Sequence, residues 1–140
     1  MLEIHCLTRE HIEMIHEQAI EKFGGQNGHY IFTLDRIESI LAQQYPYFGV
    51  DKYPGVFDKA AMLLFFFTKG HCFVDGNKRV GIGSAIVFLM INGYEDNLDD
   101  NEGYRKTLEI AGCNIEDAII RDRYIRNLSQ WLVERFKTSK

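Results

Sequence analysis

A stretch of nine residues, 71–79, places four side chains that could carry out chemistry close together in the chain. Its sequence is His-Cys-Phe-Val-Asp-Gly-Asn-Lys-Arg. His71 could act as a base, and the Asp75 carboxylate could bind a hard metal ion. Lys78 and Arg79 add positive charge, which suits a bound anion. Because few unrelated tasks need this combination, the stretch indicates a site for a phosphate group.

Two predicted helices meet at this stretch and would position it. An apolar run, residues 60–67, precedes it, and Gly70 can end that helix. A second helix is predicted over about residues 79–92. The polar residues would then form a tight loop that leads into a helix N-terminus. Free backbone N–H groups and the helix dipole favour an anion there, and Gly76 and Asn77 would shape the backbone around it.

The rest of the chain predicts further helices and no strand of useful length. Residues able to cap a helix precede most of the apolar patterns: Thr8, Asp35, Asp100 or Asn101, and Asn114. The helix of residues 57–69 is apolar nearly all round, so we expect it at the buried centre. A last amphipathic helix carries residues 124–132, and residues 26–33 suit a loop or a short β-hairpin. The prediction is one all-α domain, residues 1–140, with six to seven helices.

Composition and charge exclude several classes of protein. The chain is 46% hydrophobic and 26% charged, which is typical of a soluble globular protein. Its formal net charge of −4 gives no general attraction to nucleic acid, so we expect no direct nucleic-acid partner. The longest apolar stretch, about eight residues, is too short to cross a membrane. Three scattered cysteines and no apparent signal peptide indicate a cytoplasmic protein with reduced thiols.

Other nucleotide and nucleophile motifs fit this sequence less well. A Walker A loop needs Lys directly after Gly, but Asn77 stands between Gly76 and Lys78. Residues 81–86 resemble half of a dinucleotide fingerprint, yet no predicted strand precedes them, so close helix packing explains their small side chains better. Cys72 is a poor candidate nucleophile, because adjacent side chains seldom come within hydrogen-bonding reach and no third orienting group is evident.

Residues 71–79 resemble the signature loop of the Fic/Doc (Fido) family, H-x-F-x-D/E-G/A-N-G/K-R, and match it throughout. The resemblance extends to residues 23–25 before the predicted flap and to residues 88–94 after the motif. It implies an all-helical core with a small flap over a target-binding cleft. AMP-transferring Fic enzymes usually have Gly in place of Lys78 and a second Arg in place of Ile82. Both differences resemble the Doc branch.

The resemblance implies an ATP-dependent transferase that requires Mg²⁺. His71 would take the proton of a Ser or Thr hydroxyl on a protein target, and Asp75 would bind Mg²⁺. Phe73 would anchor the loop in the core. Four consecutive residues would bind the phosphates: Gly76, Asn77, Lys78 and Arg79. The Doc branch is associated with transfer of the terminal phosphate of ATP to a translation factor.

Two other functions stay open at this point. Gly76 is shared with the Fic branch, so transfer of AMP to a protein is the nearest alternative. A non-catalytic module that binds a nucleotide or a partner is the second, although an intact His71 and Asp75 count against it. No Ser or Thr is followed by Glu at the spacing of the inhibitory helix found in some Fic proteins. For a Doc-like chain this suggests control by an antitoxin in trans.

Overall fold

The computed structural model describes residues 3–138, which form six helices and one short pair of strands. The helices are α1 (Arg9–Phe23), α2 (Thr33–Ala42), α3 (Val56–Lys69), α4 (Asn77–Ile91), α5 (Asp100–Gly112) and α6 (Ala118–Val133). The strands β1 (Tyr94–Glu95) and β2 (Lys137–Thr138) pair antiparallel. The structure confirms the all-α class, and two residues per strand are too few to leave a pattern in the sequence.

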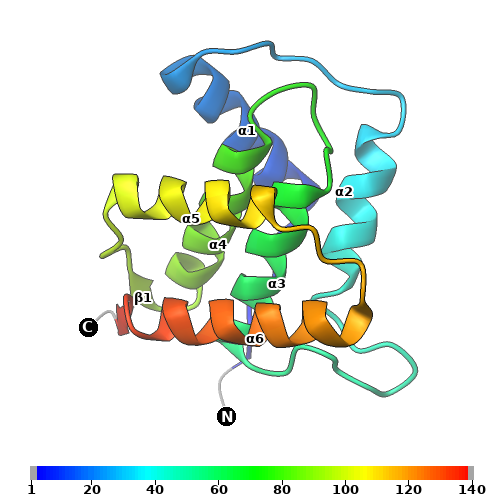
Figure 1. Ribbon diagram of the computed structural model, residues 1–140, viewed down its shortest axis with the longest axis vertical. Coiled ribbons are helices and arrows are strands. Elements are labelled where there is room, and N and C mark those ends of the chain that lie inside the picture. Colours follow the sequence, from blue (N-terminus) through cyan, green and yellow to red (C-terminus); the bar gives the residue numbers. More distant parts are fainter. Residues whose placement is uncertain (1–2, 139–140) are drawn as a thin grey trace.

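Helices α3 and α4 form the centre of the fold (Figure 1). As predicted, α3 is buried along most of its length, from Lys59 to Phe65 and again at Phe67. The two helices approach closely because Gly81 of α4 lies against Thr68 of α3. A Cβ atom added to Gly81 would lie 2.0 Å from Thr68 Oγ1. Close helix packing therefore accounts for this glycine, as the sequence suggested.

The remaining helices surround this central pair. In Figure 1, α5 and α6 run in opposite directions across α3 and α4, while α1 and α2 cover other sides of them. An ion pair joins Arg135, just after α6, to Glu102 of α5 at 2.9 Å. Lys106 of α5 lies 5.1 Å from the ring centroid of Trp131 of α6. These contacts hold α5 against α6 and the residues just after it.

Several helix starts differ from those predicted, and α5 is capped by Asp99 rather than by Asp100 or Asn101. Helix α2 begins at Thr33, before Asp35, because the Thr33 hydroxyl accepts a hydrogen bond from the Tyr30 N–H at 2.8 Å and fixes the turn there. Helix α6 is one continuous helix capped by Asp117, whose carboxylate accepts from the first N–H groups. The prediction that Asn114 caps a separate run was wrong.

The segment between α1 and α2 is not a hairpin. It arches over the loop between α3 and α4 (Figure 1), and its one β-bridge joins His29 to Phe73 of that loop. The Val74 N–H donates to the Gly28 carbonyl at 3.1 Å. The segment pairs with the loop instead of with itself, which corrects the hairpin alternative. We call residues 24–32 the flap.

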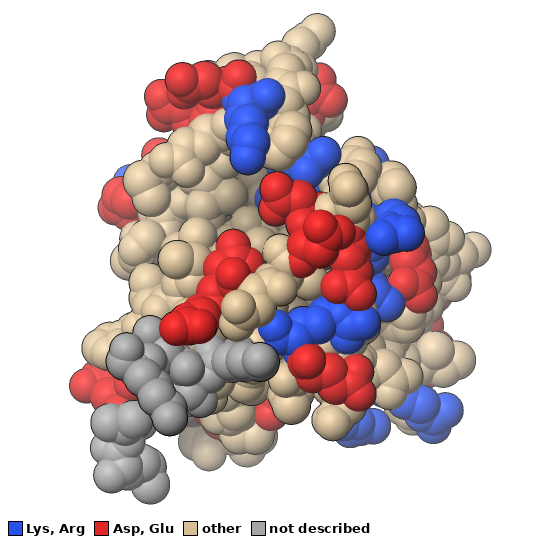
Figure 2. Space-filling view, turned by 90° about the vertical axis from the view of Figure 1, so that its left-hand side faces the viewer, with Lys and Arg blue, Asp and Glu red and all other residues tan. Residues whose placement is uncertain are grey.

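Charges of both signs are spread over the surface. Figure 2 shows one face of the molecule on which acidic side chains alternate with Lys and Arg side chains. This mixed surface agrees with the small net charge of −4. No helix among residues 3–138 is long and apolar enough to span a membrane.

Candidate active site

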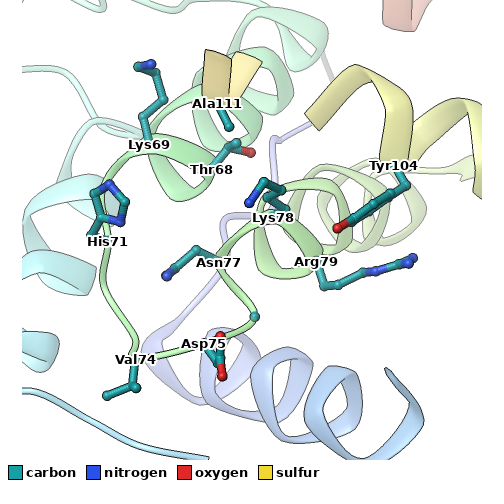
Figure 3. Close-up of a pocket in the computed structure, with 11 residues that line it drawn as sticks. Thr68, Lys69, His71, Val74, Asp75, Asn77, Lys78, Arg79, Tyr104 and Ala111 are labelled. Atoms are coloured by element: carbon teal, nitrogen blue, oxygen red, sulfur yellow. The ribbon is translucent and has the colours of Figure 1, made fainter. Parts of the chain in front are cut away.

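A cavity of about 450 Å³ lies where the end of α3, the following loop, the start of α4 and one side of α5 meet. Eleven residues line it: Thr68, Lys69, His71, Val74, Asp75, Gly76, Asn77, Lys78, Arg79, Tyr104 and Ala111. All six site residues predicted from the sequence are among them. Figure 3 shows His71 and Lys69 on one side of this cavity and Arg79 and Tyr104 on the other.

His71 stands at the turn that ends α3. The helix ends at Lys69, and Gly70 keeps a right-handed conformation with φ −78°. The left-handed residue is His71 itself, with φ 48°. Gly70 is needed for space rather than for its conformation, because a Cβ there would lie 2.6 Å from the Phe66 carbonyl oxygen. The turn leaves the His71 side chain exposed at the cavity.

Side chains of α2 hold the first half of the loop. The Arg36 guanidinium donates to the carbonyl of Gly70 at 2.8 Å and to that of His71 at 3.3 Å. The Thr33 hydroxyl donates to the Cys72 carbonyl at 2.5 Å. Three successive carbonyl groups are therefore already bound by protein donors. Sequence analysis missed both α2 residues, since nothing in the local pattern relates them to a loop about 35 residues away.

Asn77 and Phe73 close the second half of the loop on itself. The Asn77 side-chain oxygen accepts from the Phe73 N–H at 3.0 Å, and its amide nitrogen donates to the Phe73 carbonyl at 2.9 Å. The Phe73 ring is fully buried, as expected for an anchor. The Asn77 side chain therefore fixes the loop, and its backbone N–H and the second N–H of its amide remain for a ligand.

His16 of α1 contacts the loop at Phe73 and Asp75. Its Nε2 donates to the Asp75 carbonyl at 2.8 Å, and its ring stacks on Phe73 with centroids 3.7 Å apart. Burial lowers the pKa of His16, only partly offset by the hydrogen bond to Asp75, so the neutral ring is favoured. His16 was not among the site residues predicted from the sequence. Its place beside Ile12 and Ile15 on the apolar face of α1 was the signal that it is buried.

The N-terminus of α4 faces the cavity without a side-chain cap. The helix starts at Asn77, two residues earlier than predicted, because Gly76 adopts φ 85° and turns the chain directly into it. No side chain among the described residues caps this end, whereas Thr8, Asp99 and Asp117 cap other helices. Lys78 and the backbone N–H groups of the first turn are thus available to an anion.

Asp75 can bind a metal ion only together with another ligand. One carboxylate oxygen accepts a hydrogen bond from the Gln26 N–H of the flap at 3.0 Å. The side chain is exposed, and residues 3–138 contain no group of three His, Cys, Asp or Glu that could hold a metal ion. Mg²⁺ commonly binds through one or two carboxylates plus phosphate oxygens and water. The donor set fits Mg²⁺ that arrives with a phosphate.

Two other groups near the cavity are already engaged. The Lys69 ammonium donates to the carbonyls of Ile110 and Cys113 at the end of α5, at 3.2 and 2.5 Å. Its ammonium group is therefore directed to these carbonyl groups of the protein and not to the cavity. Cys72 is fully buried, and burial raises the pKa of its thiol to about 11. A neutral, buried thiol is no nucleophile, in agreement with the sequence-based view.

The fold brings an uncapped helix N-terminus, a histidine and a carboxylate together at one cavity, an arrangement that suits an anion. The chain belongs to the Fic/DOC family, whose sequence pattern matches residues 6–89, more than half of its length. This match covers α1 to α3, the loop and all but the last two residues of α4. The resemblance seen in the sequence is thereby confirmed.

Two relatives carry names of the Doc branch. Toxin Doc of Mycolicibacterium smegmatis (strain ATCC 700084 / mc(2)155) is 44% identical over 57 residues, which are 41% of this chain and 44% of that protein. Protein kinase doc of Escherichia phage P1 is 28% identical over 119 residues, 82% of this chain and 93% of that protein. The chain thus spans less than half of the first relative and nearly all of the second. Together they support a place in the Doc-like branch.

Proposed function

We propose that this protein is a Doc-like toxin that transfers the terminal phosphate of ATP to a Ser or Thr hydroxyl of a protein target, a translation factor. The observation that carries the proposal is the meeting of His71, Asp75 and the uncapped N-terminus of α4 in one cavity. A binding module would need the anion site but not the base. The name of the phage relative, a protein kinase, points the same way.

The proposed reaction is a displacement at the terminal phosphorus. The target hydroxyl oxygen forms a bond to that phosphorus, and the bond to the bridging oxygen breaks. His71 takes the hydroxyl proton, and ADP leaves with the electron pair of the broken bond. Proton removal by a positioned side chain contributes about 10²–10⁴ to a rate. His71 suits this role, since its side chain is exposed at the cavity while its carbonyl is fixed by Arg36.

The charges around the cavity support this reaction electrostatically. Bound through Asp75, Mg²⁺ would neutralise charge on the phosphate oxygens. Lys78 and the N–H groups of the first turn of α4 would stabilise the negative charge of the transferred group. Carbonyl oxygens would repel that charge, but those of residues 70–73 and 75 are held by protein donors. The loop therefore offers N–H groups to an anion.

Transfer of phosphate rather than AMP is supported by Lys78 and Ile82. AMP transfer would require the α-phosphate in the loop and a firm hold on the departing pyrophosphate. Ile82 is 7% exposed, and a Cβ added to Gly103 of α5 would lie 3.1 Å from the Ile82 Cγ1 atom. It packs against α5 and supplies no positive charge. Gly76, shared with the Fic branch, is the one residue that favours the alternative.

Labelled ATP distinguishes the alternatives directly. The purified protein is incubated with extract and Mg²⁺, together with ATP labelled at either the γ- or the α-phosphate. We expect a protein band labelled from γ-labelled ATP alone, and no band with the His71→Ala variant. Label from α-labelled ATP would establish AMP transfer instead. Nucleotide binding without any labelled protein would support the non-catalytic module.

We further propose that the protein acts in the cytoplasm and is controlled by an antitoxin in trans. Support comes from the first relative, which is named a toxin. Expression of the chain alone should arrest growth in a suitable host, whereas the His71→Ala chain should not. Equal arrest by both chains would argue against a toxic transferase activity.

A further inference from the structure

Two aromatic rings hold Arg79 at the end of the cavity opposite His71 (Figure 3). The central carbon of the guanidinium lies 3.6 Å from the ring centroid of Phe23 and 3.9 Å from that of Tyr104. Phe23 is the last residue of α1, and Tyr104 lies in α5. Since each ring covers the cation at stacking distance, the guanidinium lies between side chains of two other helices.

The edge of this guanidinium is available to a ligand. Among residues 3–138, no carboxylate forms an ion pair with Arg79, and no acceptor takes a hydrogen bond from its side chain. The guanidinium of Arg135, by contrast, pairs with Glu102 at 2.9 Å. Rings hold the faces of a guanidinium without using its N–H donors. Arg79 therefore combines a fixed position with free donors.

We propose that Phe23 and Tyr104 are positioning residues that orient Arg79 toward the diphosphate portion of the nucleotide, the part that leaves as ADP. This inference rests on the proposed function. A planar guanidinium binds phosphate with paired N–H groups, and fixing it beforehand reduces the entropy lost on binding. The location also fits, because the transferred phosphate belongs near His71, on the other side of the cavity.

Simple packing does not account for this arrangement. Phe23 is 49% exposed, so its ring contributes little to the core. Its close contact is with Arg79, whereas Lys22 lies farther from the ring, at 5.2 Å from its centroid. Tyr104 lies outside the part of the chain that matches the family pattern, residues 6–89, so that pattern assigns it no role.

The test measures affinity for ATP with Mg²⁺ by calorimetry. Phe23→Leu and Tyr104→Leu remove each ring but keep an apolar side chain, and Tyr104→Phe keeps the ring. Each Leu variant should bind about 3- to 10-fold more weakly, the size expected from loss of a cation–π contact, and Tyr104→Phe should bind within about 2-fold of wild type. Tyr47→Leu is the control, since it removes an exposed ring that does not line the cavity.

A double-mutant cycle separates positioning from general destabilisation. In an Arg79→Ala background, removal of either ring should weaken binding no further, because the rings act through Arg79. Leu variants that bind like wild type, or that weaken binding equally without Arg79, would overturn the inference. If wild type binds ATP but labels no protein, the proposed function fails. The proposal for the two rings is then still decided by the ATP affinities of the variants. Failure of wild type to bind ATP overturns both.

Discussion

His71 is the residue on which the proposed reaction depends most directly. We expect His71→Ala to lower the rate of transfer by about 10²–10⁴, because it removes the base and no neighbouring side chain replaces it. The side chain is exposed, so the fold should be unchanged. The measurement is the rate of labelling by γ-labelled ATP. Circular dichroism and the exposed control His5→Ala test for effects on folding; a variant that keeps a tenth of the activity would exclude His71 as the base.

His16 should make stability depend on pH. Burial lowers the pKa of this histidine from its ordinary 6.5, so the folded protein binds the proton more weakly than the unfolded chain. Its contribution to stability is therefore fully present above pH 6.5 and is lost as the pH falls below that value. Urea denaturation should show a falling free energy of unfolding on acidification.

The matched variant for this effect is His16→Gln. Its side-chain amide can still donate to the Asp75 carbonyl but cannot be protonated in this range. Its free energy of unfolding should depend less on pH than that of wild type, whereas His5→Gln, an exposed change, should leave the dependence unaltered. An identical pH dependence in wild type and His16→Gln would show that His16 does not titrate on unfolding.

At the scale of helices, the close approach of α3 and α4 depends on Gly81. An alanine here gains about 1 kcal/mol of helix propensity. The added Cβ would lie 2.0 Å from Thr68 Oγ1 and 3.1 Å from the Thr68 backbone nitrogen, and such overpacking costs about 1–3 kcal/mol. We expect Gly81→Ala to lower the thermal midpoint and, by moving the start of α4, to weaken ATP binding.

Two comparisons make this prediction specific. Gly112→Ala changes a helical glycine with nothing within 4 Å, so it should be neutral or slightly stabilising. Adding Thr68→Ala to Gly81→Ala should restore part of the lost stability, because the clashing hydroxyl has no hydrogen-bond partner among the described residues. If Gly81→Ala were as stable as wild type, the helices could separate without cost and the close packing would not matter.

Elements with strong local signals were predictable from the sequence. The cap at Thr8, the apolar run of α3 and the small residues of α4 each leave a pattern within their own segment. Boundaries that depend on distant contacts were not predictable. Asn77 resembles a capping residue, but its side chain binds Phe73, and the helix begins at Asn77 itself. The flap likewise pairs with a loop more than 40 residues away, which no local alternation can reveal.

The candidate site shows the same division between motif and support. All six predicted site residues line the cavity and lie within nine positions, so the sequence alone placed them together. The side chains that support them come from other helices: His16 from α1, Arg36 from α2 and Tyr104 from α5. A hydrogen bond between residues 16 and 75 has no signature in helical periodicity. The grouping of the motif residues was therefore predictable, but the residues that hold the loop in place were not.

At the scale of the whole molecule, ligand binding should raise global stability. A ligand at about 100 times its Kd stabilises the folded state by about 2.7 kcal/mol. We expect ATP with Mg²⁺ to raise the thermal midpoint by several degrees, and less so in excess chelator. The Asp75→Asn variant should lose most of the Mg²⁺-dependent rise in the thermal midpoint. Glu38→Gln, which changes an exposed carboxylate of α2, should keep that rise. If excess chelator did not reduce the rise in the thermal midpoint, no metal ion would take part in ATP binding.

The left-handed backbone conformation of His71 lowers the stability of the fold at the position where the proposed activity needs this side chain. The position after a helix C-cap usually carries glycine, because another residue there costs about 1–2 kcal/mol. Glycine would relieve that strain, although its freedom in the unfolded chain offsets roughly 0.5–1 kcal/mol. A His71→Gly protein should therefore be inactive yet at least as stable as the active one, which thermal denaturation can check. Stability alone would therefore favour glycine over histidine at this position.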